Sequence, residues 1–160
     1  MANKKRDVVE YNLTFVGANK NEAELIQGVI QSVNDMKSKD ELPMKKYLDE
    51  IKKFKVDLDL FIDIKNTLSK TKNKKLLDRL NDRIDFYEKA ISERELRVEN
   101  HKENIKFIDE YIAKIRSHIT EEIDHDKKSA TYTYDMSYLE GLIDLALIVF
   151  ELDFNDEKVS

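Results

Sequence analysis

The spacing of apolar and polar positions changes along the chain, and the first pattern is that of a β-strand. In residues 7–17, apolar side chains alternate with polar ones up to Gly17. A period of two places the apolar side chains on one face of a strand. A strand needs a partner for its backbone groups, and the best match is 130–136, where Thr and Tyr alternate. We expect a two-stranded ribbon from these segments, with pairing to a second chain as the alternative.

The next two patterns have the period of amphipathic helices. Residues 21–37 carry a single apolar stripe, and Asn21 is the predicted cap of this helix. A second helix is predicted to begin near Pro43, with Asp40 as its cap, because proline suits a first helical turn. Its apolar side chains recur at heptad spacing as far as residue 68.

The longest pattern is an apolar heptad seam through residues 77–122, which predicts one long helix. The polar segment 69–75 separates it from the preceding helix, and so short a connection predicts an antiparallel hairpin. Arg94 and His101 interrupt the seam with polar side chains. A bend or break over 92–104 is therefore the alternative to one continuous helix.

The last pattern, 136–154, is apolar on most sides over 142–150, which predicts a central, buried helix. A strand over 146–154 is the alternative. The fold class predicted is mainly α: a long antiparallel helical hairpin or coiled coil, a helical-bundle head and a small two-stranded β element. We expect a single helical domain over 1–160. The predicted stalk is 43–101, and the predicted head combines 1–42, 102–128 and 129–160.

The second half of the long seam consists of isoleucine. The shorter helix of the hairpin cannot reach it. Isoleucine at both kinds of heptad position favours three or four helices around one axis, which fits a multi-helix head and fits a dimer equally well. The predicted contact residues are Ile105, Ile108, Ile112, Ile115 and Ile119.

Composition agrees with a helical protein. The 160 residues include 3 Gly, 1 Pro and no Cys, and 41 % of them are hydrophobic. All-β folds use more Gly and Pro at their turns. The absence of Cys excludes disulfides and thiolate metal sites and fits a reducing cytosol. The chain has no apolar run long enough to span a bilayer and no signal peptide, so we expect a cytoplasmic protein with no membrane partner.

Charge is distributed unevenly around the net value of −5. Residues 43–75 are rich in Lys, and residues 129–160 contain Lys158 as their single base among many acids. This asymmetry either attracts the two regions to each other or offers opposite surfaces to partners. The predicted electrostatic contact residues are Lys70, Lys72, Lys74, Lys75, Glu151, Asp153, Asp156 and Glu157.

One cluster has the character of metal ligands. His118, Glu122 and His125 would share one face of the long helix, and Glu-x-x-His is the spacing used by di-iron four-helix bundles. Such a site needs a second pair of this kind, which the chain lacks. The alternative is a solvated helix end whose His side chains are favoured by the helix dipole. The sequence therefore predicts neither a metal nor a cofactor.

Arg94 and His101, separated by six residues, resemble the Arg-(x4–6)-His spacing of HEPN ribonucleases, which are small dimeric helical proteins. The resemblance covers these two residues, and Glu95 stands where that family usually has a polar or basic residue. It implies a ribonuclease activity. The alternative is that Arg94 and His101 are polar seam residues that fix the register or the number of helices.

No phosphate-binding loop and no nucleophile–base arrangement is visible in the sequence. We therefore predict a non-enzymatic protein–protein interaction module that acts as a regulator, adaptor or inhibitor and self-associates, with a dimer as first choice. A nucleic-acid-binding protein using the Lys-rich stretch 45–75 is the alternative. A small metal-dependent or ribonuclease enzyme is the second alternative.

Overall fold

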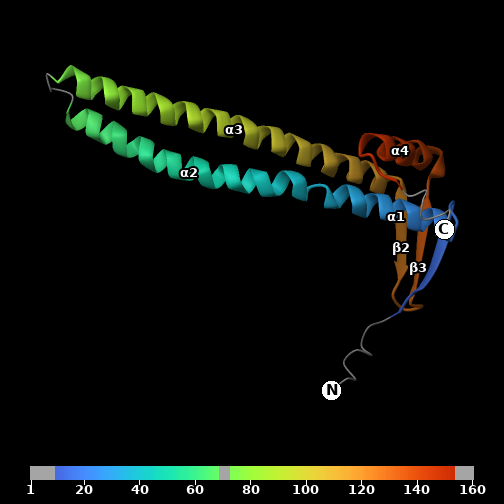
Figure 1. Cartoon of the computed structure of the whole chain (residues 1–160). Helices are drawn as coiled ribbons and strands as arrows, with labels where there is room; N and C mark the ends of the chain where they lie inside the picture. Colours follow the sequence, from blue (N-terminus) through green and yellow to red (C-terminus); the bar gives the residue numbers. More distant parts are fainter. Residues whose placement is uncertain (1–9, 69–72, 154–160) are drawn as a thin grey trace. The chain divides into compact units, whose positions relative to one another are not determined.

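The computed structural model describes residues 10–68 and 73–153. In this described part the chain is mainly α-helical, as predicted, with elements in the order β1, α1, α2, α3, β2, β3, α4 (Figure 1). The chain divides into two compact units. We call Lys37–Phe107 the hairpin unit, and Met1–Met36 together with Ile108–Ser160 the head unit.

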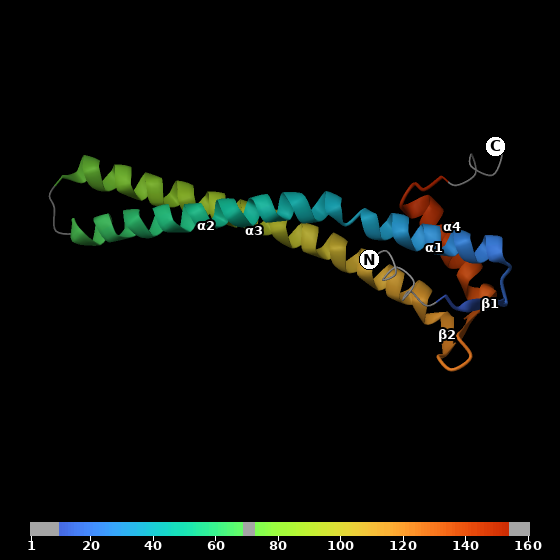
Figure 2. The same cartoon turned by 90° about the horizontal axis from the view of Figure 1, so that it is seen from below.

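The hairpin unit contains α2 (Ser38–Thr67) and most of α3 (Lys74–Ser117). The two helices lie side by side and antiparallel in both views (Figures 1 and 2). Ile51, Ile91 and Val98 are buried between them, because each helix presents an apolar seam at heptad spacing to the other. The long helix is unbroken, so the predicted alternative of a break is wrong.

The start of α2 differs from the prediction. The helix begins at Ser38, so Pro43 lies inside it and not in its first turn. Proline has no N–H to donate to the carbonyl of Lys39, one turn earlier. Asp40 is not the cap either, because it lies in the first turn and its carboxylate contacts α3.

The head unit contains a strand that the sequence pattern did not predict. α3 ends at Ser117 and β2 (Ile119–Asp124) follows, although the heptad seam predicted helix as far as residue 122. β2 includes the β-branched residues Ile119, Thr120 and Ile123, which suit a strand better than a helix. The isoleucine spacing continued across this boundary and concealed the change of structure.

The sheet of the head unit has the order β1–β3–β2. Its central strand, β3 (Ser129–Tyr134), pairs parallel with β1 (Asn12–Val16) and antiparallel with β2. The predicted β element is therefore present, with the partner predicted for the first strand, but it has three strands. Phe15 lies opposite Tyr132, and both side chains pack on the core of the head.

This core lies between one face of the sheet and three helical segments. α1 (Lys20–Asp35) buries Ile26, Val29 and Val33, and the end of α3 adds its own buried isoleucines. α4 (Met136–Val149) closes the core with a third apolar face. Burial of so many aliphatic side chains is the main source of stability of the head unit.

Two local features place α1 after β1. The Asn19 side chain accepts a hydrogen bond from the Glu22 N–H at 2.8 Å, and the Glu22 carboxylate accepts one from the Asn19 N–H at 2.9 Å. This capping box makes Asn19 the cap, two residues before the predicted cap, Asn21. Gly17 has a φ of 83°, and a Cβ there would overlap the carbonyl oxygen of Tyr134. The turn therefore requires glycine.

Candidate functional site

The outward face of α4 carries an apolar stripe. Four side chains on this face are between 47 % and 74 % exposed: Tyr138, Leu145, Ile148 and Val149. The steps of seven, three and four between them (with Val149 beside Ile148) keep these side chains on one face of the helix. The other face of the same helix is buried through Leu139, Ile143 and Ala146. Gly141 lies in the gap between Tyr138 and Leu145 and is itself exposed. A folded protein that presents such a stripe has a surface suited to another apolar surface.

The inward face of α4 is anchored to the head. Leu139 and Ala146 are completely buried. The Tyr111 hydroxyl donates a hydrogen bond to the Leu142 carbonyl, and the Tyr111 ring packs edge-on against Phe150 at 5.5 Å between centroids. Burial raises the pKa of Tyr111. The stripe is therefore presented by a helix whose orientation is fixed by a packed core.

The charged side chains of α4 and of its two ends are all acidic. Glu140 and Asp144 are exposed on α4 one turn apart, and Asp135, Glu151 and Asp153 are exposed at its two ends. Residues 129–153 contain neither Lys nor Arg. The first end of the stripe has one aromatic neighbour, because the His118 ring stacks on Tyr138 at 4.6 Å between centroids.

The sequence predicted a central, buried helix here, and this prediction is wrong for the outward face. α4 also ends at Val149, short of the predicted residue 154. Two features of the sequence indicate that one face of α4 is exposed. The residues at 138, 141, 145 and 148 repeat the heptad steps of the long seam, and one of them is glycine. In addition, a helix buried on every side would not carry Glu140 and Asp144 without partners.

The structure places the predicted isoleucine contacts mainly inside the chain. Ile108, Ile112 and Ile115 are buried in the core of the head, and Ile119 packs against that core from β2. Ile105 belongs to the hairpin unit and is half-buried. Three of the five side chains are thus buried by their own chain, and a homodimer stays a prediction.

The three predicted metal-ligand candidates do not share a helical face. His118 follows the end of α3, Glu122 lies in β2 and His125 lies in the turn after it. The His125 ring is 2.7 Å from the Tyr11 hydroxyl. Within the described residues no group of three or more His, Asp or Glu side chains could hold a metal ion. The Glu-x-x-His argument fails because it assumed a helix where the chain forms a strand.

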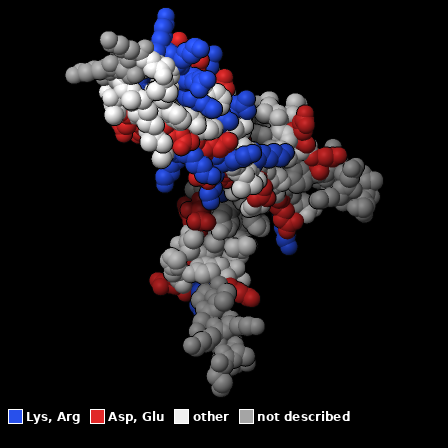
Figure 3. Space-filling model, turned by 60° about the vertical axis from the view of Figure 1, so that its left-hand side comes forward, with Lys and Arg blue, Asp and Glu red and all other residues white. Residues whose placement is uncertain are grey.

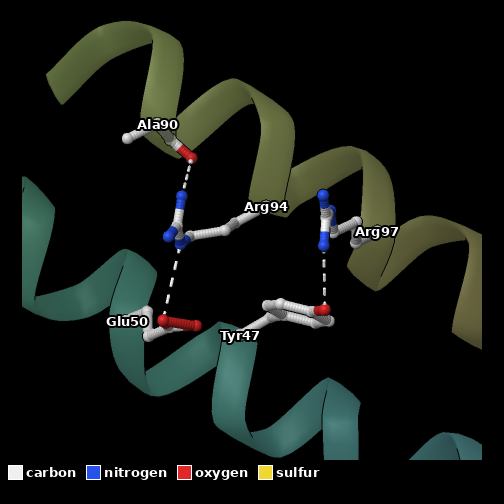
Figure 4. Close-up of polar contacts among 5 residues, drawn as sticks. All are labelled: Tyr47, Glu50, Ala90, Arg94 and Arg97. Atoms are coloured by element: carbon white, nitrogen blue, oxygen red, sulfur yellow. Dashed lines mark hydrogen bonds and ion pairs between the residues drawn. The ribbon is translucent and has the colours of Figure 1, made fainter. Parts of the chain in front are cut away.

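Arg94 lies in the seam of the hairpin and contacts three residues there, two of which, Ala90 and Glu50, are drawn in Figure 4. One guanidinium nitrogen donates to the Ala90 carbonyl at 3.2 Å, and Nε lies 3.6 Å from a Glu50 carboxylate oxygen. The guanidinium also sits over the Phe54 ring at 4.7 Å. The next turn adds Arg97, which donates to the Tyr47 hydroxyl at 3.1 Å.

His101 occupies the equivalent position two turns further along α3. Its Nδ1 lies 2.8 Å from an Asp40 carboxylate oxygen, and the same oxygen accepts a hydrogen bond from Asn104 at 3.1 Å. Its ring stacks on Tyr47. The Arg and His of the HEPN-like spacing are thus each engaged with an acid of α2, an arrangement that matches polar residues fixing the register of a seam.

The predicted lysine and acidic contacts are only partly described. Lys70, Lys72, Asp156 and Glu157 lie outside the described residues, whereas Lys74 and Lys75 are exposed in the first turn of α3, and Glu151 and Asp153 are exposed after α4. On α2, Lys45, Lys46 and Lys53 line a shallow depression together with Leu42, Asp49 and Glu50. Figure 3 shows Lys and Arg interspersed with Asp and Glu on the visible face. On this face, and in the depression of α2, the basic side chains therefore do not form a surface of one sign.

Comparison with known protein families, curated proteins and solved structures gives no significant match to this chain. No helix in the described ranges combines the length and the apolar character needed to cross a lipid bilayer.

Proposed function

We propose that this protein is a non-enzymatic helical interaction module that docks on a partner protein through the outward stripe of α4. The observation that carries the proposal is that four large apolar side chains of one anchored helix face solvent at heptad spacing. Such a face is the surface that a partner helix covers in helix-to-helix recognition. The module would act as a regulator, adaptor or inhibitor, because occupation of a partner surface requires no chemistry of its own.

The packing of α4 supports recognition by a preformed surface. Leu139, Ile143 and Ala146 hold the helix to the head, so docking would not require the helix to fold first. A preorganised surface avoids the entropy that a disordered segment loses on binding. The exposed side chains of the stripe are therefore free to contribute their burial to affinity.

The proposal is tested with two matched substitutions. Leu145→Asp places a charge in the centre of the stripe, whereas Leu96→Asp places one on α3, where Leu96 is 64 % exposed and outside the stripe. Proteins captured from a native lysate by the wild type and both variants are identified by mass spectrometry, and the partner is then purified and titrated. We expect binding of the purified partner to be lost with Leu145→Asp and kept with Leu96→Asp.

A partner that binds both variants equally would overturn the proposal, since its contact would lie elsewhere. Circular dichroism and the urea midpoint of each variant show that the fold is retained. Both substituted leucines are exposed, so we expect the two midpoints to be close to that of the wild type.

A further inference from the structure

The chemistry around the α4 stripe indicates which kind of partner it fits. Glu140 and Asp144 border the stripe one helical turn apart, and Asp135 and Glu151 stand near its two ends. Within the described part of the chain, neither Glu140 nor Asp144 is within ion-pair distance of a base. Both carboxylates therefore remain available to positive charges of a partner that lies along the stripe.

A second copy of this chain is a poor occupant of the same face. Two α4 helices related by a twofold axis would bring the acids of one copy near those of the other. Like charges facing each other across an interface oppose association. Without Lys or Arg in residues 129–153, α4 and its flanking segments have no base that could offset this repulsion.

A lipid surface is disfavoured by the same charges. Helices that lie on membranes carry Lys and Arg on the polar side of their apolar face, where these side chains meet anionic headgroups. The polar side of α4 carries Glu140 and Asp144 instead.

We propose that the α4 stripe binds an amphipathic helix of a partner protein whose apolar face is bordered by Lys and Arg. This inference rests on the proposed function and adds the chemistry of the partner. Leu145 and Ile148 supply the apolar contact, while Glu140 and Asp144 select the basic border. The exposed backbone at Gly141 offers a flat place where the partner helix can approach closely, because a Cβ built there meets no atom within 4 Å.

The test uses three synthetic peptides of three heptads each. The first has Leu along one face and Lys on both borders, the second has Glu in place of the Lys, and the third is a scrambled form of the first that has no continuous apolar face. Fluorescence anisotropy measures their binding to the full chain at low and at high salt. The wild type should bind the Lys-bordered peptide about tenfold more tightly than the Glu-bordered one at low salt, and this preference should shrink as salt is added.

Three variants separate the contributions. The double variant Glu140→Lys/Asp144→Lys should reverse the preference, so that the Glu-bordered peptide binds more tightly. Leu145→Asp should lose about tenfold or more in affinity for the Lys-bordered peptide, because it removes the central apolar contact. Leu96→Asp, which adds the same charge at an exposed position of α3, should bind like the wild type.

Several results would overturn the inference, and they differ from a failure of the proposed function. If both bordered peptides bind alike and both require Leu145, the charge selection is refuted while docking through the stripe stands. If the scrambled peptide binds as well as the first, attraction between net charges explains the binding and the inference fails. Self-association or vesicle binding that requires Leu145, in place of peptide binding, would identify a second copy or a lipid surface as the occupant.

Discussion

The sharpest test of the fold concerns Ile115, because its side chain decides whether the isoleucine seam is covered by this chain or by another. Ile115 is 0 % exposed and lies in the core of the head. Truncation to Ala removes buried carbon atoms and leaves a cavity that a packed core closes only in part. We expect Ile115→Ala to lower the free energy of unfolding by about 3–4 kcal/mol, and Ile115→Val by about 1 kcal/mol.

The matched control is Ile148→Ala on the outward face of α4. Ile148 is 74 % exposed, so the same chemical change should alter stability by less than about 0.5 kcal/mol. Urea unfolding followed by circular dichroism measures both values. Hydrogen exchange read by mass spectrometry shows whether the loss of protection in Ile115→Val is confined to the head unit.

Protein concentration separates the two explanations of the seam. If the isoleucines are covered within one chain, the unfolding midpoint does not depend on concentration. If they are covered by a second copy, a hundredfold dilution lowers the apparent stability by about 2.7 kcal/mol through mass action. A loss below about 1 kcal/mol for Ile115→Ala would refute the intramolecular core. A midpoint that falls on dilution in the wild type and equally in Leu145→Asp would also refute it, because self-association through the α4 stripe would be lost in that variant.

Three further outcomes follow from local geometry, each measured by urea unfolding. Gly17→Ala should destabilise the protein by about 2 kcal/mol or more, because a positive φ is unfavourable for alanine and its Cβ would overlap a backbone carbonyl. Gly141→Ala lies in open space on a helix and should stabilise the protein by about 0.5–1 kcal/mol. Equal effects of the two substitutions would contradict the structure. Asn19→Ala should cost about 1 kcal/mol through loss of the capping box, and an unchanged midpoint would argue against that cap. The pKa of Tyr111 is raised by burial, so the unfolded chain loses the phenol proton at a lower pH than the folded chain. The stability of the wild type should therefore fall as pH rises above about 10. The stability of Tyr111→Phe should fall less steeply, and equal slopes would refute the pKa shift.

The hairpin could be predicted from the sequence because its periodicity is local. Heptad spacing in two successive segments, with a polar connection between them, specifies an antiparallel pair without knowledge of the rest of the chain. The pairing of the first strand with 130–136 was also predictable, since both segments alternate with period two. The details that differ from the prediction are element ends: Pro43 lies inside α2 and not at its start, and Asn19 caps α1 in place of Asn21.

The remaining failures have a common physical cause, which is that packing decides between patterns that look alike in the sequence. Ile119 continues the helical spacing of Ile112 and Ile115, yet it lies in β2, where pairing with β3 satisfies its backbone. Residue type alone does not distinguish the exposed Tyr138 and Leu145 from the buried Leu139. Only the position of the head core shows that Leu139 is buried and that the other two face outward.

The polar residues of the hairpin seam bear on where recognition can take place. Removing one partner of a half-buried ion pair such as Arg94–Glu50 leaves a charge without compensation, although the intact pair adds little net stability. Such pairs therefore act on specificity, by favouring the register in which Arg94 meets Glu50 and His101 meets Asp40. Ile51, Ile91 and Val98 are buried within the hairpin, and Arg94 and His101 each meet an acid of α2, although the Arg94 Nε atom makes no hydrogen bond. The proposed recognition therefore does not depend on the seam, because α4 presents its apolar side chains at helical spacing on an outward surface.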